Sequence, residues 1–206
     1  MIYNVEMISC IILAAGLSSR FGSPKALATI KDSPAITFLL KNIYSSRIDE
    51  IIVVLGSDCD AIEPHLFKHK LIRVVYNNDY KFGQTSSVQT GLKALSSHTD
   101  AFMILPVDCS FIQTKTIDKL IEHYKRNHPQ ILIPSYNSKK GHPPVFKQEL
   151  KEHIIKLTYA EGLNKITQNP AFSTETLELP DPGITQTFNT PEELSRILNS
   201  SDFKTT

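Results

Sequence analysis

Residues 8–25 read ISCIILAAGLSSRFGSPK, and this stretch decides which fold the rest of the chain must build. Residues 8–13 are an almost continuous run of apolar and β-branched side chains, which predicts a strand buried on both faces of a sheet. The run ends in a turn of small residues, where backbone N–H groups can approach a ligand closely. In α/β proteins, ligands bind beyond the carboxyl ends of such strands, so this turn is the first place to look for a site.

The rest of the turn carries groups that suit a phosphate-bearing ligand. Ser18 and Ser19 add hydroxyl groups, and Arg20 and Lys25 add two cations that can neutralise phosphate. The alternative is an ordinary surface loop with two solvated cations. Because a buried strand, a small-residue turn and two spaced cations coincide, we favour the ligand. We predict nucleotide contacts for Leu13, Ala14, Ala15, Gly16, Ser19, Arg20 and Lys25.

The turn matches neither of the two common phosphate-binding fingerprints. A Walker A loop ends in GKS or GKT, and this turn has a single glycine before Arg20, so GxGxxG is absent as well. A nicotinamide-dependent dehydrogenase is therefore a poorly supported hypothesis.

Strand-like and helix-like segments alternate along the chain. Strands are predicted at residues 8–13, 51–55, 71–75, 101–105, 131–134 and 145–146, and helices at 35–45, 58–68, 86–96 and 114–125, the last with Thr114 as N-cap. Such alternation predicts a mostly parallel sheet in a three-layer α/β/α arrangement. We expect one domain over residues 1–206, with a polar tail at about 200–206.

Composition excludes several classes of protein. Hydrophobic residues make up 41% of the chain and charged residues 21%, which allows a core and argues against disorder. The net charge of +1 without a basic run predicts no nucleic-acid or membrane surface. We find no signal peptide and no apolar stretch of the roughly 18–20 residues that a transmembrane helix needs. Three widely spaced cysteines favour a reducing cytoplasm.

The stretch LAAGLSSRFGSPK, residues 13–25, resembles the signature loop of the MobA-like NTP transferases, whose common form is LAAGxSxRMGxxK. This resemblance implies a Rossmann-like sheet in which the loop wraps a nucleoside triphosphate and Arg20 and Lys25 serve its phosphates. Residues 77–91 resemble the N…GxxxS…G segment of the family, which implies nucleotide contacts for Asn77, Gly83 and Ser86. Serines at a helix start more often cap the helix than bind a ligand, so Ser86 has a structural alternative.

Asp108 follows the predicted strand at 101–105 and resembles the acidic metal motif of the family. A carboxylate there can hold Mg²⁺ on the phosphates of the triphosphate, and the alternative is a helix cap or a solvated acid. Residues 188–194, FNTPEEL, resemble the family ending D-[IV]-D-T-P-E-D-L, with Asn189 in place of the second aspartate. We predict Asp108 and Asn189 as the metal ligands, although Thr-Pro-Glu-Glu is also a good helix start.

Two segments bear on the acceptor. Residues 141–143, GHP, resemble the cytidylyltransferase-like branch; we assign His142 no role as metal ligand or base, and expect it to help shape the acceptor pocket. The GDxGxR element of that branch is represented by YAEGLN, residues 159–164, without its aspartate and arginine. Cys109, where the family usually has proline, is most simply a small buried residue.

The sequence thus predicts a Mg²⁺-dependent nucleotidyltransferase with Arg20, Lys25 and Asp108 as catalytic residues. It would move an NMP unit from an NTP, with CTP favoured, to a small phosphorylated acceptor such as the molybdenum cofactor. The alternative is a non-catalytic nucleotide-binding or cofactor-handling accessory protein, which Asn189 and the altered residues Ala160 and Asn164 favour slightly.

Overall fold

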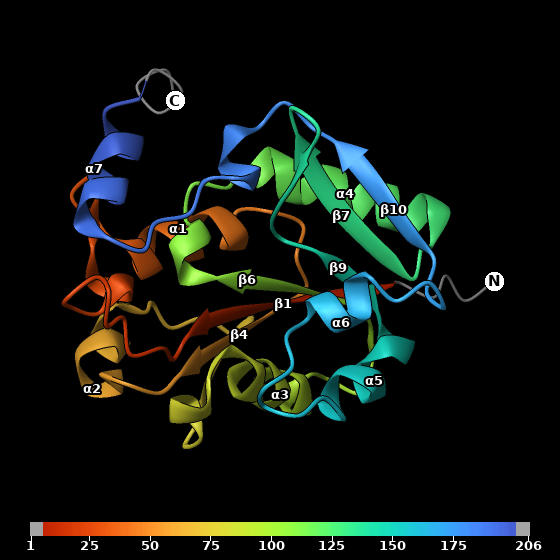
Figure 1. The fold of residues 1–206 in the computed structure, drawn as a ribbon, viewed down its shortest axis with the longest axis horizontal. Helices are drawn as coiled ribbons and strands as arrows, with labels where there is room; N and C mark the ends of the chain where they lie inside the picture. Colours follow the sequence, from red (N-terminus) through yellow and green to blue (C-terminus); the bar gives the residue numbers. More distant parts are fainter. Residues whose placement is uncertain (1–5, 201–206) are drawn as a thin grey trace.

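The computed structural model describes residues 6–200, which form a twisted sheet with helices on both faces (Figure 1). The main sheet has eight strands in the order β10-β7-β9-β6-β1-β4-β5, with β8 paired to β7. Its strands are β1 (Met7–Ala14), β4 (Glu50–Leu55), β5 (Ile72–Tyr76), β6 (Thr99–Pro106), β7 (Ile131–Tyr136), β8 (Lys139–Lys140), β9 (Val145–Lys147) and β10 (Thr174–Glu178). Strands β5, β4, β1 and β6 are parallel neighbours, and β9 runs antiparallel to β6 and β7. The predicted Rossmann-like α/β/α fold with a mostly parallel sheet is therefore confirmed.

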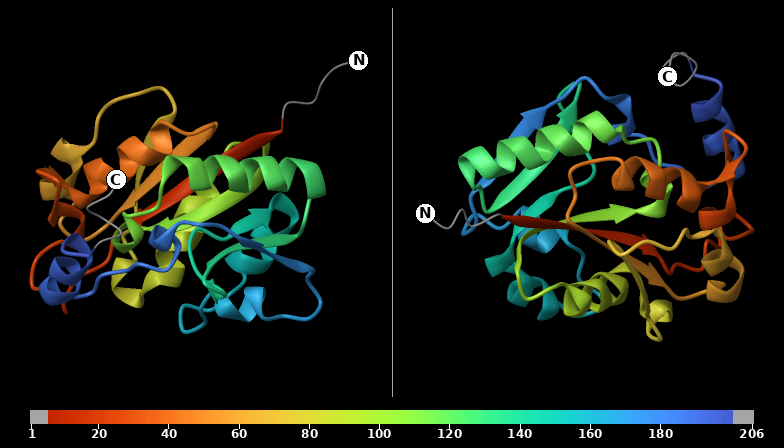
Figure 2. Two further views of the ribbon diagram at one scale, coloured as in Figure 1. Left: turned by 90° about the horizontal axis from the view of Figure 1, so that it is seen from above. Right: turned by 180° about the vertical axis from the view of Figure 1, so that it is seen from behind.

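The described residues contain seven α-helices, five of which cover the two faces of the sheet. They are α1 (Ala35–Tyr44), α2 (Cys59–Ile62), α3 (Gln84–Ala94), α4 (Thr114–Asn127), α5 (Lys151–Ile155), α6 (Asn164–Thr167) and α7 (Pro191–Leu198). Helices α1 and α4 cover one face of the sheet, and α3, α5 and α6 cover the other (Figures 1 and 2). A short hairpin of β2 (Thr29–Ile30) and β3 (Ser33–Pro34) lies apart from the main sheet. Within residues 6–200, no helix has both the length and the apolar character needed to cross a membrane.

The central strand β1 is buried on both faces because its side chains alternate between two hydrophobic cores. Cys10 and Ile12 pack in the core under α1 and α4, and Ile11 and Leu13 pack in the core under α3. Strands β4 and β6 divide in the same way. This alternation explains why the sequence shows continuous apolar runs in place of a polar and apolar alternation.

The parallel strands end at one edge of the sheet, and this edge positions the site. Leu13 in β1 pairs with Pro106 in β6, and Ala14 pairs with Leu55 in β4. The turn after β1 therefore begins next to the turn after β6, although the two are far apart in the chain. The three-residue 3₁₀ turns η1 (Lys25–Leu27), η3 (Tyr80–Phe82) and η4 (Val107–Cys109) all lie in loops that follow these strands.

Two helix predictions need correction. The helix predicted at 58–68 is only α2, followed by the 3₁₀ turn η2 (Glu63–His65). Pro64 stops the α-helix because it has no N–H to continue the hydrogen-bond ladder. Thr114 does not cap α4: the N-cap is Gln113, and Thr114 donates its hydroxyl to the backbone of Asn42. Asp181, from a distant loop, accepts from the Gln113 N–H in its place.

Three further differences concern boundaries and strands. Helix α3 begins at Gln84, two residues before the predicted start, so Ser86 lies inside the helix. Strand β10, which pairs in parallel with β7, was not predicted. The polar tail expected at about 200–206 lies, beyond Ser200, outside the described residues.

Gly91 allows α3 to lie directly on β1 and β4. A Cβ at this position would lie 2.4 Å from Cγ2 of Ile11 and 3.1 Å from Cγ2 of Val54. We expect Gly91→Ala to destabilise the protein by up to about 2 kcal/mol, because overpacking costs roughly 1–3 kcal/mol and the gain in helix propensity offsets only about 1 kcal/mol of it. Denaturant unfolding measures the loss. Lys93→Ala, on the exposed side of the same helix, is the control and should change stability by less than about 0.5 kcal/mol.

Candidate active site

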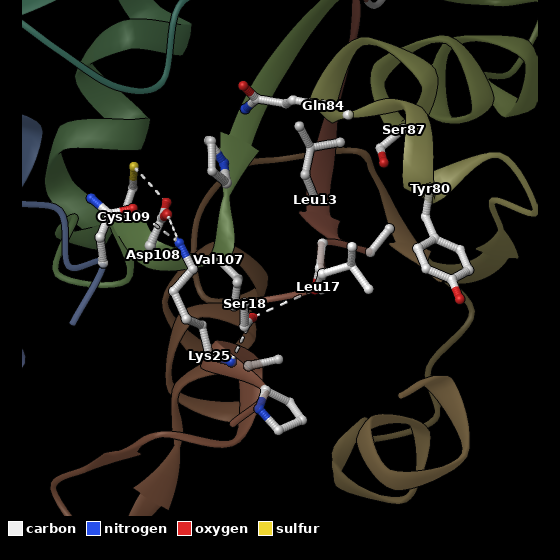
Figure 3. A pocket seen from close by; sticks show the side chains of 18 of the residues that line it. Leu13, Leu17, Ser18, Lys25, Tyr80, Gln84, Ser87, Val107, Asp108 and Cys109 are labelled. Carbon is white, nitrogen blue, oxygen red and sulfur yellow. Dashed lines mark hydrogen bonds and ion pairs between the residues drawn. The ribbon is translucent and has the colours of Figure 1, made fainter. Parts of the chain in front are cut away.

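A cavity of about 500 Å³ opens at the carboxyl edge of the sheet. Figure 3 shows Asp108 and Cys109 on one side of it, Tyr80 and Ser87 on the other, and Leu13 and Gln84 between them. The predicted residues Leu13, Ala14, Ala15, Gly16, Arg20, Lys25, Gly83, Asp108 and Asn189 line the cavity. Ser19, Asn77 and Ser86 do not line it. Tyr80, Lys81, Gln84, Ser87, His142 and Thr187 also line the cavity, and none of them was predicted as a nucleotide or metal contact.

The turn after β1 is closed by Ser18. Its backbone carbonyl accepts from the N–H groups of Phe21 and Gly22, and its hydroxyl oxygen accepts from the Lys25 N–H at 3.0 Å. Ser18 has a φ of 51°, in the left-handed region that tight turns require. This local bonding brings Lys25 back to the cavity, whereas Ser19 lies exposed on the outside of the turn.

Arg20, Lys25, Asp108 and Asn189 meet in one polar cluster. The Lys25 ammonium group pairs with Oδ2 of Asp108, and the side chains are 17% and 20% exposed. The Asn189 Oδ1 atom accepts from Nη2 of Arg20 at 2.8 Å and from Nζ of Lys25 at 3.4 Å. Segments from the beginning, middle and end of the chain thus supply one site.

The C-terminal segment holds Asn189 in place through backbone bonds and packing. The Phe188 N–H donates to the Asp108 carbonyl at 3.3 Å, and the Asn189 N–H donates to Oε2 of Glu193 at 2.6 Å. Thr190 caps α7 by accepting from the Glu193 N–H, so the predicted helix start is confirmed. The Phe188 ring is fully buried and meets the Phe21 ring edge-on at 5.8 Å. This aromatic contact ties the turn after β1 to the end of the chain.

Asn77 lies behind the cavity wall that faces Asp108 and supports that wall through hydrogen bonds. Its Oδ1 accepts from the Asp79 N–H, which fixes the orientation of the amide, and its Nδ2 donates to the hydroxyls of Ser86 and Ser87, both at 2.9 Å. The one hydroxyl proton of Ser86 is shared between the carbonyls of Asp79 and Gly83, which lie 2.9 and 2.8 Å from the hydroxyl oxygen. Asn77 is 3% exposed and Ser86 2%. Their positions assign them to the support of the cavity wall, not to its surface.

Ser87 is the member of this network that reaches the cavity. It is 5% exposed, and its side chain lines the cavity (Figure 3). Within residues 6–200 its hydroxyl accepts from Asn77 and donates to no protein group. Because Asn77 donates to the Ser87 oxygen, the hydroxyl proton can rotate to donate to a ligand in the cavity. Ser87 can therefore hydrogen-bond an acceptor atom of a base or ribose.

The oxygen atoms at the other side suit a divalent cation. Asp108 and Asn189 offer carboxylate and amide oxygens, the kind of donor that Mg²⁺ prefers, and the Lys25 ammonium lies in contact with both. A positive group already occupies the position between them. Within the described residues, no group of three or more His, Cys, Asp or Glu side chains could hold a metal alone. A metal here would need further oxygens from a ligand, such as phosphate.

Cys109 adds no nucleophile to the site. Burial, and then the neighbouring Asp108 carboxylate, raise the pKa of the Cys109 thiol well above its usual value. The thiol is therefore protonated at neutral pH and acts as a small packed side chain, as predicted.

The residues that replace the GDxGxR element do not reach the cavity. The Glu161 carboxylate pairs with Lys165 and accepts from the Thr158 N–H, and the hydrogen bond from Lys165 is the main reason why the pKa of Glu161 falls to about 2. The Tyr159 ring stacks on the exposed Phe82 ring, with centroids 5.4 Å apart. None of residues 158–164 lines the cavity.

Comparison with known proteins defines the class. The model of the MobA-like NTP transferase domain matches residues 10–176. A "Probable molybdenum cofactor guanylyltransferase" of Bacillus mycoides is 29% identical over 155 residues, which cover 73% of this chain and 74% of the relative. Among solved structures, Rv0371c of Mycobacterium tuberculosis superposes with a TM-score of 0.84 at 20% identity, covering 95% of this chain and 99% of that one. A Methanothermobacter nucleotidyl transferase, Mth528, gives 0.81 at 21% identity, covering 97% and 99%.

The α/β fold with a cation-lined cavity at its carboxyl edge thus belongs to a nucleotidyltransferase. Since the family model covers well over half of the chain, the chain is a member of the MobA-like NTP transferase family. The predicted family is confirmed. The two solved structures support the fold alone at these identities.

Ser87→Ala should weaken nucleotide binding without weakening the fold. A net hydrogen bond contributes about 0.5–1.5 kcal/mol, so we expect a loss of affinity of roughly twofold to tenfold. Titration with GTP and with CTP, next to thermal unfolding, measures both effects. Ser86→Ala is the matched control: it removes the hydroxyl that accepts from Asn77 and contacts the carbonyls of Asp79 and Gly83, and it should lower the melting temperature more than the affinity. Unchanged affinity in Ser87→Ala would remove Ser87 from the nucleotide site.

Lys25→Met should raise the affinity for free Mn²⁺ in the absence of nucleotide. The ammonium group competes with a metal for Asp108 and Asn189, and its removal should improve metal binding on the order of tenfold. Arg20→Met is the control, since Arg20 contacts Asn189 but makes no bond to Asp108. Both changes should weaken NTP binding at least tenfold, because each removes a cation for which we predict a charge-assisted phosphate contact of about 1.5–3 kcal/mol. Paramagnetic resonance of Mn²⁺ decides; equal metal affinity in all three proteins contradicts this account.

Proposed function

We propose that this enzyme transfers an NMP unit from an NTP to the phosphate of the molybdenum cofactor and releases pyrophosphate. GMP is the first candidate for the transferred unit. The observation that carries the proposal is the cluster of Arg20, Lys25, Asp108 and Asn189 at the carboxyl edge of β1 and β6. The acceptor comes from the names of relatives such as the Bacillus mycoides protein.

The chemistry needs little from the protein beyond positioning and charge. An oxygen of the acceptor phosphate attacks the α-phosphorus, the bond to the β-phosphate oxygen breaks, and that oxygen leaves with pyrophosphate. The nucleophile is already an anion, so no protein base is needed. Arg20 and Lys25 neutralise the triphosphate and the departing pyrophosphate, and the turn after β1 holds them in place.

A divalent cation fits the site. Asp108 and Asn189 are the residues that would hold it, and the NTP phosphates would complete its set of oxygens. When bound, Mg²⁺ would neutralise charge that develops on the phosphates. For this, Lys25 must exchange the Asp108 carboxylate for phosphate oxygens, which keeps its positive charge paired before and after NTP binding.

Two nucleotides are candidates for the NTP substrate. GTP is supported by relatives named molybdenum cofactor guanylyltransferases, at 28–30% identity. CTP is the second candidate, because Ala14, Ala15 and the GHP segment resemble the cytidylyltransferase-like branch. Ser87 does not separate the bases, since both carry acceptor atoms for a hydroxyl proton. A non-catalytic accessory protein is a further alternative, and the joint presence of both cations and Asp108 argues against it.

Pyrophosphate release tests the function. Purified protein is mixed with Mg²⁺, molybdenum cofactor and each of the four NTPs. We expect release with GTP, and a preference for CTP would correct the base while retaining the class. Thermal shift with the same NTPs gives an independent measure of binding, since a ligand of the native state raises stability. Nucleotide binding without release, for every NTP, would indicate the accessory protein.

Asp108→Asn should abolish Mg²⁺-dependent release while the fold stays near wild type. Asp108 is the only carboxylate in the cluster, and its loss leaves two neutral amide oxygens that hold Mg²⁺ weakly. If Asp108 were only a structural residue, the change would cost about 1 kcal/mol of stability and leave the Mg²⁺ dependence unaltered. A Mg²⁺ titration of pyrophosphate release separates the two, with the melting temperature as control.

A further inference from the structure

The segment between β8 and β9 carries His142 into the cavity on a fixed backbone. The His142 N–H donates to the Ile184 carbonyl at 2.9 Å, and the Gly141 N–H donates to the Pro134 carbonyl at 2.9 Å. On the far side, the Ile104 N–H in β6 donates to the Pro144 carbonyl at 3.3 Å. A Cβ on Gly141 would lie 1.9 Å from the Ile184 carbonyl oxygen, so only glycine allows this approach. The backbone position of His142 is therefore set before any ligand arrives.

The His142 ring has no hydrogen-bond partner at one nitrogen. Nδ1 is enclosed and has no partner among the described residues, a property it shares there only with Oε1 of Gln148. Gln148 does not line the cavity, whereas His142 does. Buried polar atoms without a partner are rare in native proteins, and each costs about 1–3 kcal/mol. Because Nδ1 is enclosed, a ligand in the cavity could pair with it and relieve that cost only if the ring turned toward the cavity.

The imidazole differs in character from the other polar groups of the cavity. Burial lowers the pKa of His142, and the Asp108 carboxylate and the nearby Ile104 backbone only partly oppose this effect. The neutral ring has one N–H and one lone pair, so it can both donate and accept. Arg20 and Lys25 suit the phosphates of the NTP, while this ring suits a group that needs a directed hydrogen bond.

The division of the cavity indicates which ligand meets His142. Ser87 and Tyr80 lie on the side of the cavity opposite Asp108. In the proposed function this side would take the base, and the turn after β1 would hold the triphosphate. The remaining wall, next to Asp108, includes His142, Val107 and Thr187. Residues 158–164, which replace the acceptor element of the cytidylyltransferase-like branch, do not line the cavity. The acceptor must therefore be oriented by this remaining wall.

We propose that His142 is an acceptor-positioning residue, which hydrogen-bonds the phosphorylated acceptor where it enters beside Asp108. This proposal rests on the proposed nucleotidyl transfer. Its effect belongs to acceptor binding, and NTP binding should be independent of it.

Three variants test the proposal. His142→Phe keeps a ring without nitrogen, His142→Asn places a polar atom near the position of Nδ1, and His142→Gln near that of Nε2. With the NTP selected by the panel above and molybdenum cofactor as acceptor, His142→Phe should raise the acceptor KM at least tenfold. The dissociation constant for the NTP should stay within twofold. His142→Asn or His142→Gln should have an acceptor KM at least threefold lower than that of His142→Phe.

Acceptor binding is also measured without turnover. The NTP is replaced by its analogue with a methylene bridge between the α- and β-phosphates, and cofactor binding to this complex is titrated for each variant. An unchanged acceptor KM and affinity in His142→Phe, or an equal loss of NTP binding, would overturn the proposal. If His142→Phe does not fold, the polar variants decide, and equal tenfold losses in both would mark His142 as structural. If the wild type releases no pyrophosphate, the proposed function is rejected and this proposal with it. If the wild type turns over and His142→Phe leaves the acceptor KM and affinity unchanged, only this proposal is rejected.

Discussion

The parallel pairing of β1 with β6 is the constraint on which the site depends. It sets Leu13 opposite Pro106, so the turn after β1 and the turn with Asp108 leave the sheet side by side. Lys25 can then reach Asp108 across 83 residues of sequence. The pairing is stable because β1 is buried on both faces, between the cores under α1 and α3. A register shift of one residue would turn every side chain of β1 to the opposite core, which makes the alignment of the site a consequence of core packing.

Around this edge, the side chains that face the cavity are held by others that do not. Asn77 orients Ser87, Ser18 holds the backbone of Lys25, and Glu193 holds the backbone of Asn189. The Phe21 and Phe188 rings join the first turn to the last segment of the site. Such support lets polar groups point at a ligand with little loss of conformational entropy on binding, which is the basis of preorganisation.

Burial explains which elements could be predicted from the sequence and which could not. Strands β1, β4 and β6 could be predicted because burial on both faces leaves an unbroken apolar run, and Asp108 could be predicted because it follows such a run. Strand β10 could not, because Thr174–Glu178 is a mostly exposed edge strand and only its pairing with β7 defines it. Ser87 was missed in favour of Ser86, although the GxxxS spacing counted from Gly83 ends at Ser87. Neighbouring residues of a helix point about 100° apart, so a choice one residue away replaces the serine that lines the cavity with one that lies behind its wall.

The amide at position 189 changes the electrostatics of the site beyond the count of metal ligands. Three cations, Arg20, Lys25 and Lys81, line the cavity against the single carboxylate of Asp108, which leaves a positive cavity suited to an anionic triphosphate. The family form has an aspartate where this chain has Asn189, which lies 2.8 Å from Arg20. A carboxylate there would hold the guanidinium by a charge-assisted bond, roughly twice as strong as a bond to a neutral amide. Arg20 would then have to leave a stronger partner before it could bind phosphate. In the proposed function, the amide would keep Arg20 in position while lowering the free energy needed to release it to phosphate. This gain in phosphate binding would offset part of the weaker attraction for the metal.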